Sequence, residues 1–238
     1  KVVDVRVYAA PMMAFFEGSC DGVTYLRCIN DRCPPDEDYR QYMTTVGNKL
    51  LPYLQKPRLS MACGRGDLFA RRDLLELLGR VRPEDPGCEI RLETNGVLLE
   101  SRWEAVAHFE KYRLAVTVTP NSFNRYTYRN LSGGKDNLDQ MLGSLAFASK
   151  LRGAGKIAEF NITVVVQDRN FRELPHIIGR SLEEYGADKV TLRPVLPWFR
   201  ITPEDYWFKN LLNPLHPYHE EYLDVMSDPA CCDPRVFH

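Results

Sequence analysis

Apolar positions along this chain fall into short runs with a two-residue period, which alternate with longer stretches whose apolar residues recur every three or four positions. The short, often β-branched runs predict strands, and the longer stretches of about ten to fifteen residues predict amphipathic helices. The predicted strands are Val2–Ala9, Val23–Leu26, Arg58–Met61, Glu89–Glu93, Leu114–Thr119, Phe160–Val166 and Lys189–Leu192. The predicted helices are Asp36–Leu51, Ala70–Val81, Leu99–Tyr112, Leu138–Leu151 and Phe171–Tyr185.

Strands that alternate with helices predict parallel pairing through right-handed crossovers. We recognise about six strand–helix units, fewer than the eight of a complete TIM barrel. The pattern alone fits a partial barrel or an open doubly wound sheet, and in both the ligand site lies where strands end and helices begin. The loops at these positions are 20–33, Ala62–Phe69, Thr94–Val97, Thr119–Arg129, Gln167–Asn170 and Arg193–Trp198.

The first of these loops, CDGVTYLRCINDRC, contains Cys20, Cys28 and Cys33. Thiolates are soft ligands and a short loop brings several of them to one point, which favours a metal or iron–sulfur site. The alternative is that these cysteines are small apolar fillers. The chain has seven cysteines at irregular spacings, which argues against a disulfide framework and predicts reduced thiols in the cytoplasm.

Composition narrows the possible partners. The 238 residues fit one large α/β domain better than two. The net charge of −1 gives no electrostatic reason to expect nucleic acid or an anionic membrane as a partner. No apolar run is long enough to cross a bilayer, so we expect no membrane association.

Three other loops carry candidate ligand-binding residues. Gly64 and Gly66 let the backbone approach a ligand closely, and Asn95 offers an amide within a turn. We interpret 119–134 as a long polar and aromatic loop at the solvated surface, and the alternative is that its Arg125 and Arg129 bind a carboxylate or ribose. Near the end of the chain, His216 and His219 have a metal-like spacing, but the proline between them prevents a regular helix.

Several segments resemble the radical S-adenosylmethionine (radical SAM) superfamily. LETNGVLLE (Leu92–Glu100) is similar to the end of that family's third strand, AVTVTPNSFNRYTYRNLSGG (115–134) to its fourth strand and following loop, and NITVVVQDRNFRELPHII (Asn161–Ile178) to its fifth strand and next helix. The resemblance covers about residues 22–197. It implies a partial (β/α)6 TIM-like barrel over 1–198, followed by an extension, 199–238, that packs on the barrel or leads to a further domain.

The resemblance also implies cofactors and the residues that hold them. A [4Fe-4S] cluster is expected in the loop after the first strand, and S-adenosylmethionine beside it. The family usually binds the cluster with a CxxxCxxC run, whereas this chain has four residues between Cys28 and Cys33, and Asp36 three residues later. Either Cys20, Cys28 and Cys33 form an unusually spaced ligand set with Val2–Ala9 as the first strand, or Val23–Leu26 is that strand and one ligand is missing.

A second departure concerns the site for the methionine group. Where the family has a GGEP-like run, this chain has Gly64, Gly66 and Asp67, with a glycine at the glutamate position. Losing that carboxylate weakens recognition of an ammonium group, and Asp67 is the candidate substitute. Asn95, Thr119 and Arg129 are the corresponding candidates around the nucleoside or carboxylate.

Two functions therefore remain open at this point. In one, the chain generates a deoxyadenosyl radical from S-adenosylmethionine at the cluster and modifies an unidentified substrate, either a peptide or a small molecule. In the other, the fold has lost both cofactors and acts as a binding or scaffolding module for a partner protein.

Overall fold

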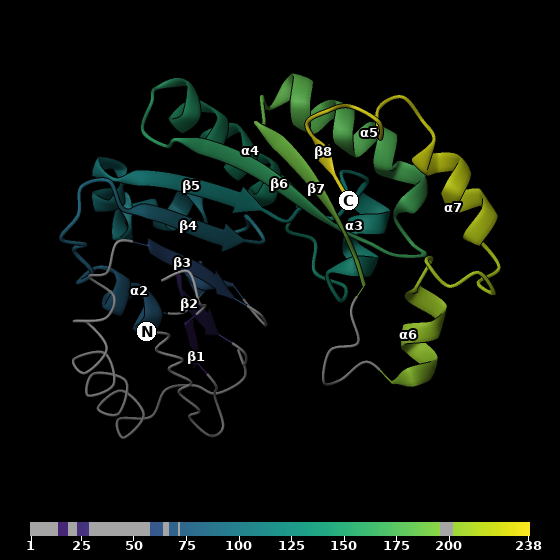
Figure 1. The fold of residues 1–238 in the computed structure, drawn as a ribbon, viewed down its shortest axis with the longest axis horizontal. Helices are drawn as coiled ribbons and strands as arrows, with labels where there is room; N and C mark the ends of the chain where they lie inside the picture. Colours follow the sequence, from purple (N-terminus) through teal and green to yellow (C-terminus); the bar gives the residue numbers. More distant parts are fainter. Residues whose placement is uncertain (1–13, 19–22, 29–57, 64–66, 71, 196–201) are drawn as a thin grey trace. The chain divides into compact units, whose positions relative to one another are not determined.

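We describe the fold from a computed structural model, drawn in Figure 1, which describes residues 14–18, 23–28, 58–63, 67–70, 72–195 and 202–238. The chain forms two compact units, which we describe separately. The first consists of residues up to Thr117 together with 150–159, and the second of 118–149 and 160–238. The predicted strand Val2–Ala9 and the predicted helix Asp36–Leu51 lie outside the described residues.

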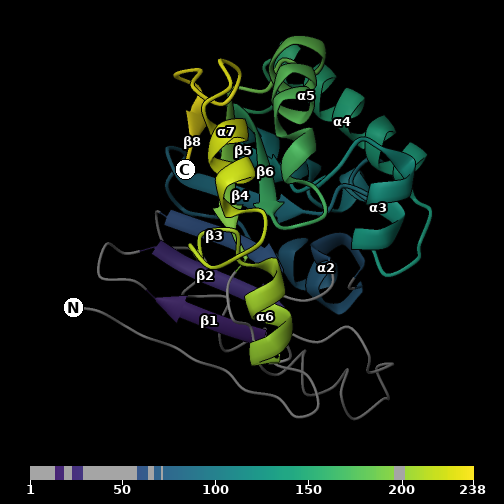
Figure 2. The same cartoon turned by 90° about the vertical axis from the view of Figure 1, so that its right-hand side faces the viewer.

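The first unit is organised around a sheet with the strand order β1-β2-β3-β4-β5. Its strands are β1 (Ala14–Gly18), β2 (Val23–Cys28), β3 (Arg58–Cys63), β4 (Glu89–Thr94) and β5 (Arg113–Val118). Strand β1, which the sequence pattern did not predict, pairs antiparallel with β2, whereas the pairs β2–β3 and β3–β4 are parallel. Figure 2 shows β1, β2 and β3 side by side. Helix α2 (Arg72–Leu78) lies in the connection from β3 to β4.

The segment predicted as one α-helix over Leu99–Tyr112 is instead two 3₁₀ helices, η2 (Glu100–Ala105) and η3 (Ala107–Lys111). Val106 separates them, with a φ of −125° that lies outside the helical region. The buried residues recur every third position, which matches the three residues per turn of a 3₁₀ helix better than the 3.6 of an α-helix. These residues are Trp103, Val106, Phe109 and Tyr112.

The second unit contains three parallel strands in the order β6 (Glu159–Val166), β7 (Lys189–Pro194) and β8 (Val236–Phe237). Strand β6 is almost entirely buried, as expected for a strand covered on both faces. Between β6 and β7 the chain passes through η4 (Phe171–Glu173), α5 (Leu174–Gly179) and a π-helical turn, Arg180–Glu184. Together these three segments fill the predicted helix Phe171–Tyr185.

Two further helices follow β5, α3 (Arg125–Leu131) and α4 (Leu138–Gly153). Helix α3 corrects the interpretation of 119–134 as a long loop. The Asn124 side chain caps this helix by accepting hydrogen bonds from the backbone N–H groups of Tyr126 and Thr127. An asparagine at the N-cap stabilises a helix start, so this residue is the local signal that predicts α3.

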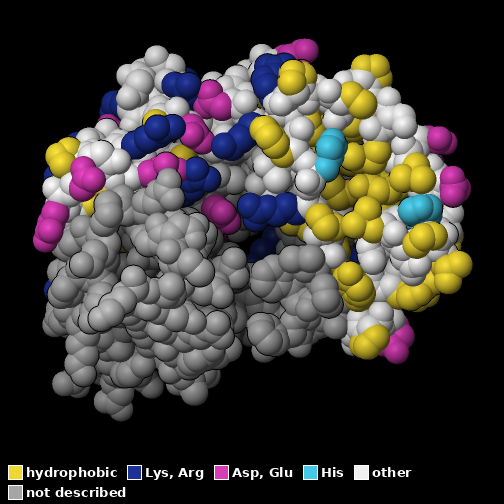
Figure 3. Space-filling model, in the orientation of Figure 1, with side chains coloured by type: hydrophobic (Ala, Val, Ile, Leu, Met, Phe, Trp, Pro, Cys, Tyr) yellow, Lys and Arg dark blue, Asp and Glu magenta, His cyan; other side chains and the backbone are white. Residues whose placement is uncertain are grey.

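The last part of the chain contains α6 (Pro203–Lys209) and α7 (His219–Met226). Helix α7 lies beside η4, where the Tyr222 ring meets the Phe171 ring edge-on at 6.3 Å and Glu221 forms a bidentate ion pair with Arg172. Hydrophobic side chains also gather on the outer surface of this region, as Figure 3 shows. Exposed members include Trp207, Phe208, Leu212, Leu215, Tyr218 and Leu223.

The coarse prediction of an α/β fold with parallel strands is confirmed. Within each unit the strands form an open sheet in chain order. In the part of the chain that the structure describes, no helix combines the length and the hydrophobicity that a membrane span requires.

Candidate functional site

The carboxyl ends of β2, β3 and β4 lie next to one another in the first unit. Parallel pairing directs the three strands the same way, so the loops that follow them leave from one edge of the sheet. Cys28 is the last residue of β2, Cys63 of β3 and Thr94 of β4. The alternation of strands and helices in the sequence predicts that ligand-binding loops start at this edge.

Asp67, in the loop after β3, connects that loop to the end of β4. Its side chain is buried, and one carboxylate oxygen accepts hydrogen bonds from the Thr94 hydroxyl at 2.5 Å and the Asn95 backbone N–H at 2.6 Å. The other oxygen accepts the Phe69 backbone N–H at 2.8 Å. The carboxylate therefore fixes the relative positions of the two loops.

Burial also perturbs the ionisation of this carboxyl group. Desolvation raises the pKa of Asp67 above its ordinary value, because the charged form loses its hydration. The hydrogen bonds from Thr94, Asn95 and Phe69 and the positive charge of Arg102 act in the opposite direction but are smaller. Arg102 is anchored nearby, since its guanidinium donates to the Phe69 carbonyl at 2.7 Å.

The turn that follows β4 is held by its own side chains. The Thr94 hydroxyl accepts the Gly96 N–H at 3.1 Å, and the Asn95 side-chain oxygen accepts the Val97 N–H at 2.9 Å. Gly96 has a φ of 85°, a conformation that favours glycine. Asn95 is exposed at this turn.

The remaining candidates, Thr119 and Arg129, belong to the second unit. Thr119 is half-buried directly after β5. In the same loop Asn121 adopts a φ of 60°, and its side chain accepts the Val165 N–H at 2.9 Å. Asn170 donates to the backbone carbonyls of both residues, at 2.8 Å to Asn121 and 3.0 Å to Val165. The loop after β5 is thus fixed to the end of β6.

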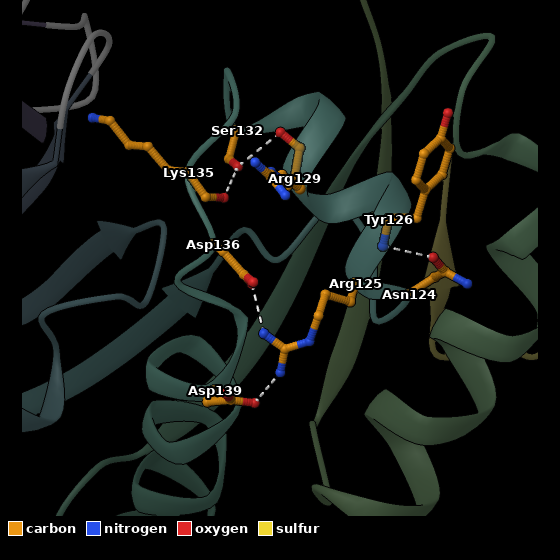
Figure 4. Close-up of polar contacts among 8 residues, drawn as sticks. All are labelled: Asn124, Arg125, Tyr126, Arg129, Ser132, Lys135, Asp136 and Asp139. Carbon is orange, nitrogen blue, oxygen red and sulfur yellow. Dashed lines mark hydrogen bonds and ion pairs between the residues drawn. The ribbon is translucent and has the colours of Figure 1, made fainter.

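The two arginines of α3 differ in the ion pairs that they form within the protein (Figure 4). Arg125 makes ion pairs of 2.6 Å with both Asp136 and Asp139, and the hydrogen bonds to these carboxylates raise the pKa of its guanidinium. Arg129 is exposed in the last turn of α3 and forms no ion pair within the described part of the chain. Of the two, Arg129 is therefore better able to bind an external carboxylate.

One polar cluster in the second unit was not predicted from the sequence. The Glu173 carboxylate accepts hydrogen bonds of 2.5 Å from the buried hydroxyls of Ser122 and Thr127. Glu173 ends η4 and precedes α5, so its carboxylate connects the junction of these two helices to the loop before α3 and to α3 itself. The N-cap residue Asn124 predicts the start of α3 beside this cluster. No pattern in the sequence links the segment around Asn124 to Glu173.

The predicted metal ligands can be placed only in part. Cys20, Cys33, Gly64 and Gly66 lie outside the described residues, and Cys28 is placed by its backbone at the end of β2. Among the side chains that the structure describes, no three His, Cys, Asp or Glu residues come together as potential metal ligands.

The alternative histidine site is not supported by the geometry of His216. Its Nδ1 accepts the Tyr218 backbone N–H at 3.1 Å, so Nε2 carries the proton and donates to the Phe208 carbonyl at 3.0 Å. Both ring nitrogens are engaged, leaving no lone pair for a metal. His219 bonds the Leu211 carbonyl through Nδ1 at 2.7 Å.

Comparison of the sequence with protein-family models and with curated proteins gives no match.

Proposed function

We propose that this chain is a radical SAM-type protein, with a [4Fe-4S] cluster and S-adenosylmethionine held at the carboxyl edge of the first unit. The observation that carries the proposal is the adjacency of the carboxyl ends of three consecutive parallel strands, β2, β3 and β4. Strand β2 ends at Cys28, the connection after β3 contains Asp67, and the connection after β4 begins with the Thr94–Gly96 turn. The proposal includes a partial (β/α)6 TIM-like barrel as the complete fold.

The donor set suits an iron–sulfur cluster. Cys28 begins the loop after a parallel strand, and Cys33 follows five positions later in the sequence. Thiolates are the usual ligands of such clusters. The described strand Val23–Cys28 favours the view that this strand, rather than Val2–Ala9, precedes the cluster loop. Cys20 then stands before the strand in sequence, on the other side of it from Cys33.

Residues around S-adenosylmethionine divide into positioning and contacting groups. Asp67 accepts three hydrogen bonds from the protein, so we assign it the role of positioning the Thr94–Gly96 turn. We assign to Gly64 and Gly66 the close approach of the methionine group to the backbone, and to the exposed Asn95 a hydrogen bond with the ligand. The sequence resemblance, rather than the geometry, names Thr119 and Arg129 as candidate partners of the nucleoside and the carboxylate.

When bound, the cluster and S-adenosylmethionine supply a carbon radical that abstracts hydrogen from a substrate. Residues of this chain would orient the cofactors and exclude water from that edge. We propose the cytoplasm as the compartment, because reduced thiols persist there. The proposed substrate is a peptide or a small molecule.

The second candidate function is a binding or scaffolding module that has lost both cofactors. The observation that favours it is the engagement of Asp67, whose carboxylate is buried and occupied by protein donors. An acid in that state is poorly available to a ligand's ammonium group. Such a module would bind a partner protein.

Anaerobic reconstitution separates the two functions. The purified chain is incubated with iron and sulfide, and the iron–sulfur charge-transfer absorbance and the bound iron are measured. S-adenosylmethionine binding to the reconstituted chain is then measured by calorimetry. A brown, iron-loaded chain that binds S-adenosylmethionine supports the radical SAM function. A folded chain that takes up no iron refutes it and favours the binding module.

A further inference from the structure

Exposed hydrophobic side chains are concentrated in one part of the second unit. Eight large hydrophobic residues are exposed in the part of the chain that the structure describes, and six of them lie between positions 207 and 223. Single exposed hydrophobic residues are normal on a protein, whereas a group of them marks an interaction site. We call this group the α6–α7 surface, and its members are Trp207, Phe208, Leu212, Leu215, Tyr218 and Leu223.

The turns between α6 and α7 hold two of these leucines in place. The Asn210 side chain accepts the Leu212 N–H at 3.2 Å, and the Asn213 side chain accepts the Leu215 N–H at 3.0 Å. Three backbone hydrogen bonds of 2.9–3.1 Å, each spanning three residues, follow one another over 210–219. The leucines therefore project from a backbone whose polar groups are engaged within the protein.

A buried histidine connects the aromatic members of the surface. The His216 ring lies 6.1 Å from the Trp207 ring and 5.7 Å from the Tyr218 ring, measured between ring centroids. Its Nε2 also bonds the backbone carbonyl of Phe208 at 3.0 Å. A partner thus meets a preformed surface, which lowers the entropic cost of binding.

The same segment is strongly acidic. Residues 202–228 contain six acidic residues, one lysine and no arginine, whereas the net charge of the whole chain is only −1. An ion pair with Arg172 offsets one of these charges, that of Glu221. Figure 3 shows acidic side chains (magenta) at the margin of the hydrophobic ones (yellow). The exposed carboxylates without an ion pair in the described part of the chain include Glu204, Asp205, Glu220 and Asp224.

This charge decides between possible occupants of the surface. Negative charge repels nucleic acid and anionic membranes, and a second copy of this chain would bring the same carboxylates to the contact. A partner that carries lysine and arginine beside its apolar side chains is attracted instead.

We propose that the α6–α7 surface docks a basic amphipathic segment of a partner protein. Apolar side chains of that segment cover the exposed rings and leucines, and burial of this area supplies the affinity. Its lysines and arginines lie beside the carboxylates and supply specificity. The proposal is independent of the cluster and S-adenosylmethionine, since none of these surface residues is assigned to either cofactor.

A pair of peptides tests the proposal on the wild-type chain. The probe is a fluorescent peptide of about 18 residues with leucine on one helical face and lysine on the other, and the control peptide has glutamate in place of lysine. Fluorescence anisotropy at low salt should give saturable binding of the lysine peptide with a dissociation constant of about 10–100 μM. We expect the glutamate peptide to bind at least about tenfold more weakly, and salt to weaken binding of the lysine peptide.

Substitutions then place the binding on this surface. The double variant Phe208→Ser/Leu215→Ser should raise the dissociation constant of the lysine peptide about tenfold or more. Tyr126→Ser is the matched control, because Tyr126 and Leu215 are both 77% exposed and Tyr126 belongs to α3 of the same unit. This control should bind like the wild type. Glu220→Gln/Asp224→Asn should bind about threefold more weakly and with a smaller salt dependence.

Several results would overturn the proposal. These are equal binding of the two peptides, no saturable binding of the lysine peptide up to about 500 μM, or unchanged binding by a folded Phe208→Ser/Leu215→Ser chain. The peptide comparison needs only the wild type, so it decides the question even if that variant fails to fold.

Two further measurements examine the other occupants. Sedimentation of the chain alone would reveal a dimer that the double variant abolishes, which would assign the surface to a second copy. Flotation with phosphatidylcholine vesicles would reveal lipid binding that the double variant abolishes. Either result overturns docking of a basic segment, whereas a monomer that ignores the vesicles and binds the lysine peptide supports it.

Discussion

Replacing Asp67 by asparagine tests whether one carboxylate holds the two loops together. Asparagine has the same size but only one side-chain oxygen. If that oxygen takes the place that accepts from Thr94 and Asn95, the amide N–H₂ faces the Phe69 N–H, and two donors then oppose each other. At least one buried donor loses its acceptor in either orientation.

The expected loss of stability follows from these contacts. A hydrogen bond to a charged group contributes about 1.5–3 kcal/mol, and an unsatisfied buried donor costs about 1–3 kcal/mol. We expect Asp67→Asn to lower the free energy of unfolding by about 2–4 kcal/mol. At a urea dependence of about 2 kcal/mol per molar, the midpoint falls by about 1–2 M.

Equilibrium urea unfolding, followed by circular dichroism, measures this change. The matched control is Asp85→Asn, because the exposed Asp85 side chain accepts a hydrogen bond from the Gly87 N–H at 2.8 Å, which an asparagine oxygen also accepts. We expect the control to lie within about 0.5 kcal/mol of the wild type. If Asp67→Asn is as stable as the control, the carboxylate does not hold the loops and our account of this site is wrong.

Three further predictions concern Asp67, Asn121 and Cys231. Burial raises the pKa of Asp67 above its ordinary 3.8, so the folded chain binds this proton more tightly than the unfolded chain. The unfolding free energy of the wild type, measured relative to that of Asp67→Asn, should therefore fall as the pH rises through the folded pKa. A rise would contradict this sign. Asn121→Ala should destabilise the chain by about 2 kcal/mol, because alanine is strained at a φ of 60° and lacks the acceptor of the Val165 N–H. Asn121→Gly also lacks that acceptor but relieves the strain, so it should cost about 1 kcal/mol less. Equal losses for the two variants would show that strain is absent. Burial raises the pKa of the Cys231 thiol to about 11. Iodoacetamide at about pH 8 should therefore label the exposed Cys232 and spare Cys231 until the chain is unfolded. Equal labelling of Cys231 and Cys232 in the folded chain would refute the burial of Cys231.

The sequence predicted the strands well because their signal is local. Arg58–Met61 and Lys189–Leu192 begin where β3 and β7 begin, and each strand extends two residues further. Those extra residues are held by pairing with neighbouring strands, which the hydrophobic pattern does not contain. Strand β1 was missed because its sequence, AFFEG, lacks a repeated two-residue alternation.

The candidate site was predictable in outline only. The general rule for parallel strands brings the loops of Asp67 and Asn95 to one edge, and the structure joins them by a hydrogen bond. Which donors a carboxylate accepts is a tertiary property. Glu173 meets Ser122 across 51 positions of sequence, and no pattern in either segment predicts the other. The register of Cys28 with Cys63 is of the same kind, since it depends on the alignment of two separate strands.

The three-residue period of η2 and η3 has a consequence for how this segment tolerates changes in length. In a 3₁₀ helix each residue turns the chain by about 120°. Inserting or deleting one residue between Trp103 and Phe109 would therefore rotate every later buried side chain onto a different face. A change of three residues restores the same face, so length variation here should be accepted in steps of three.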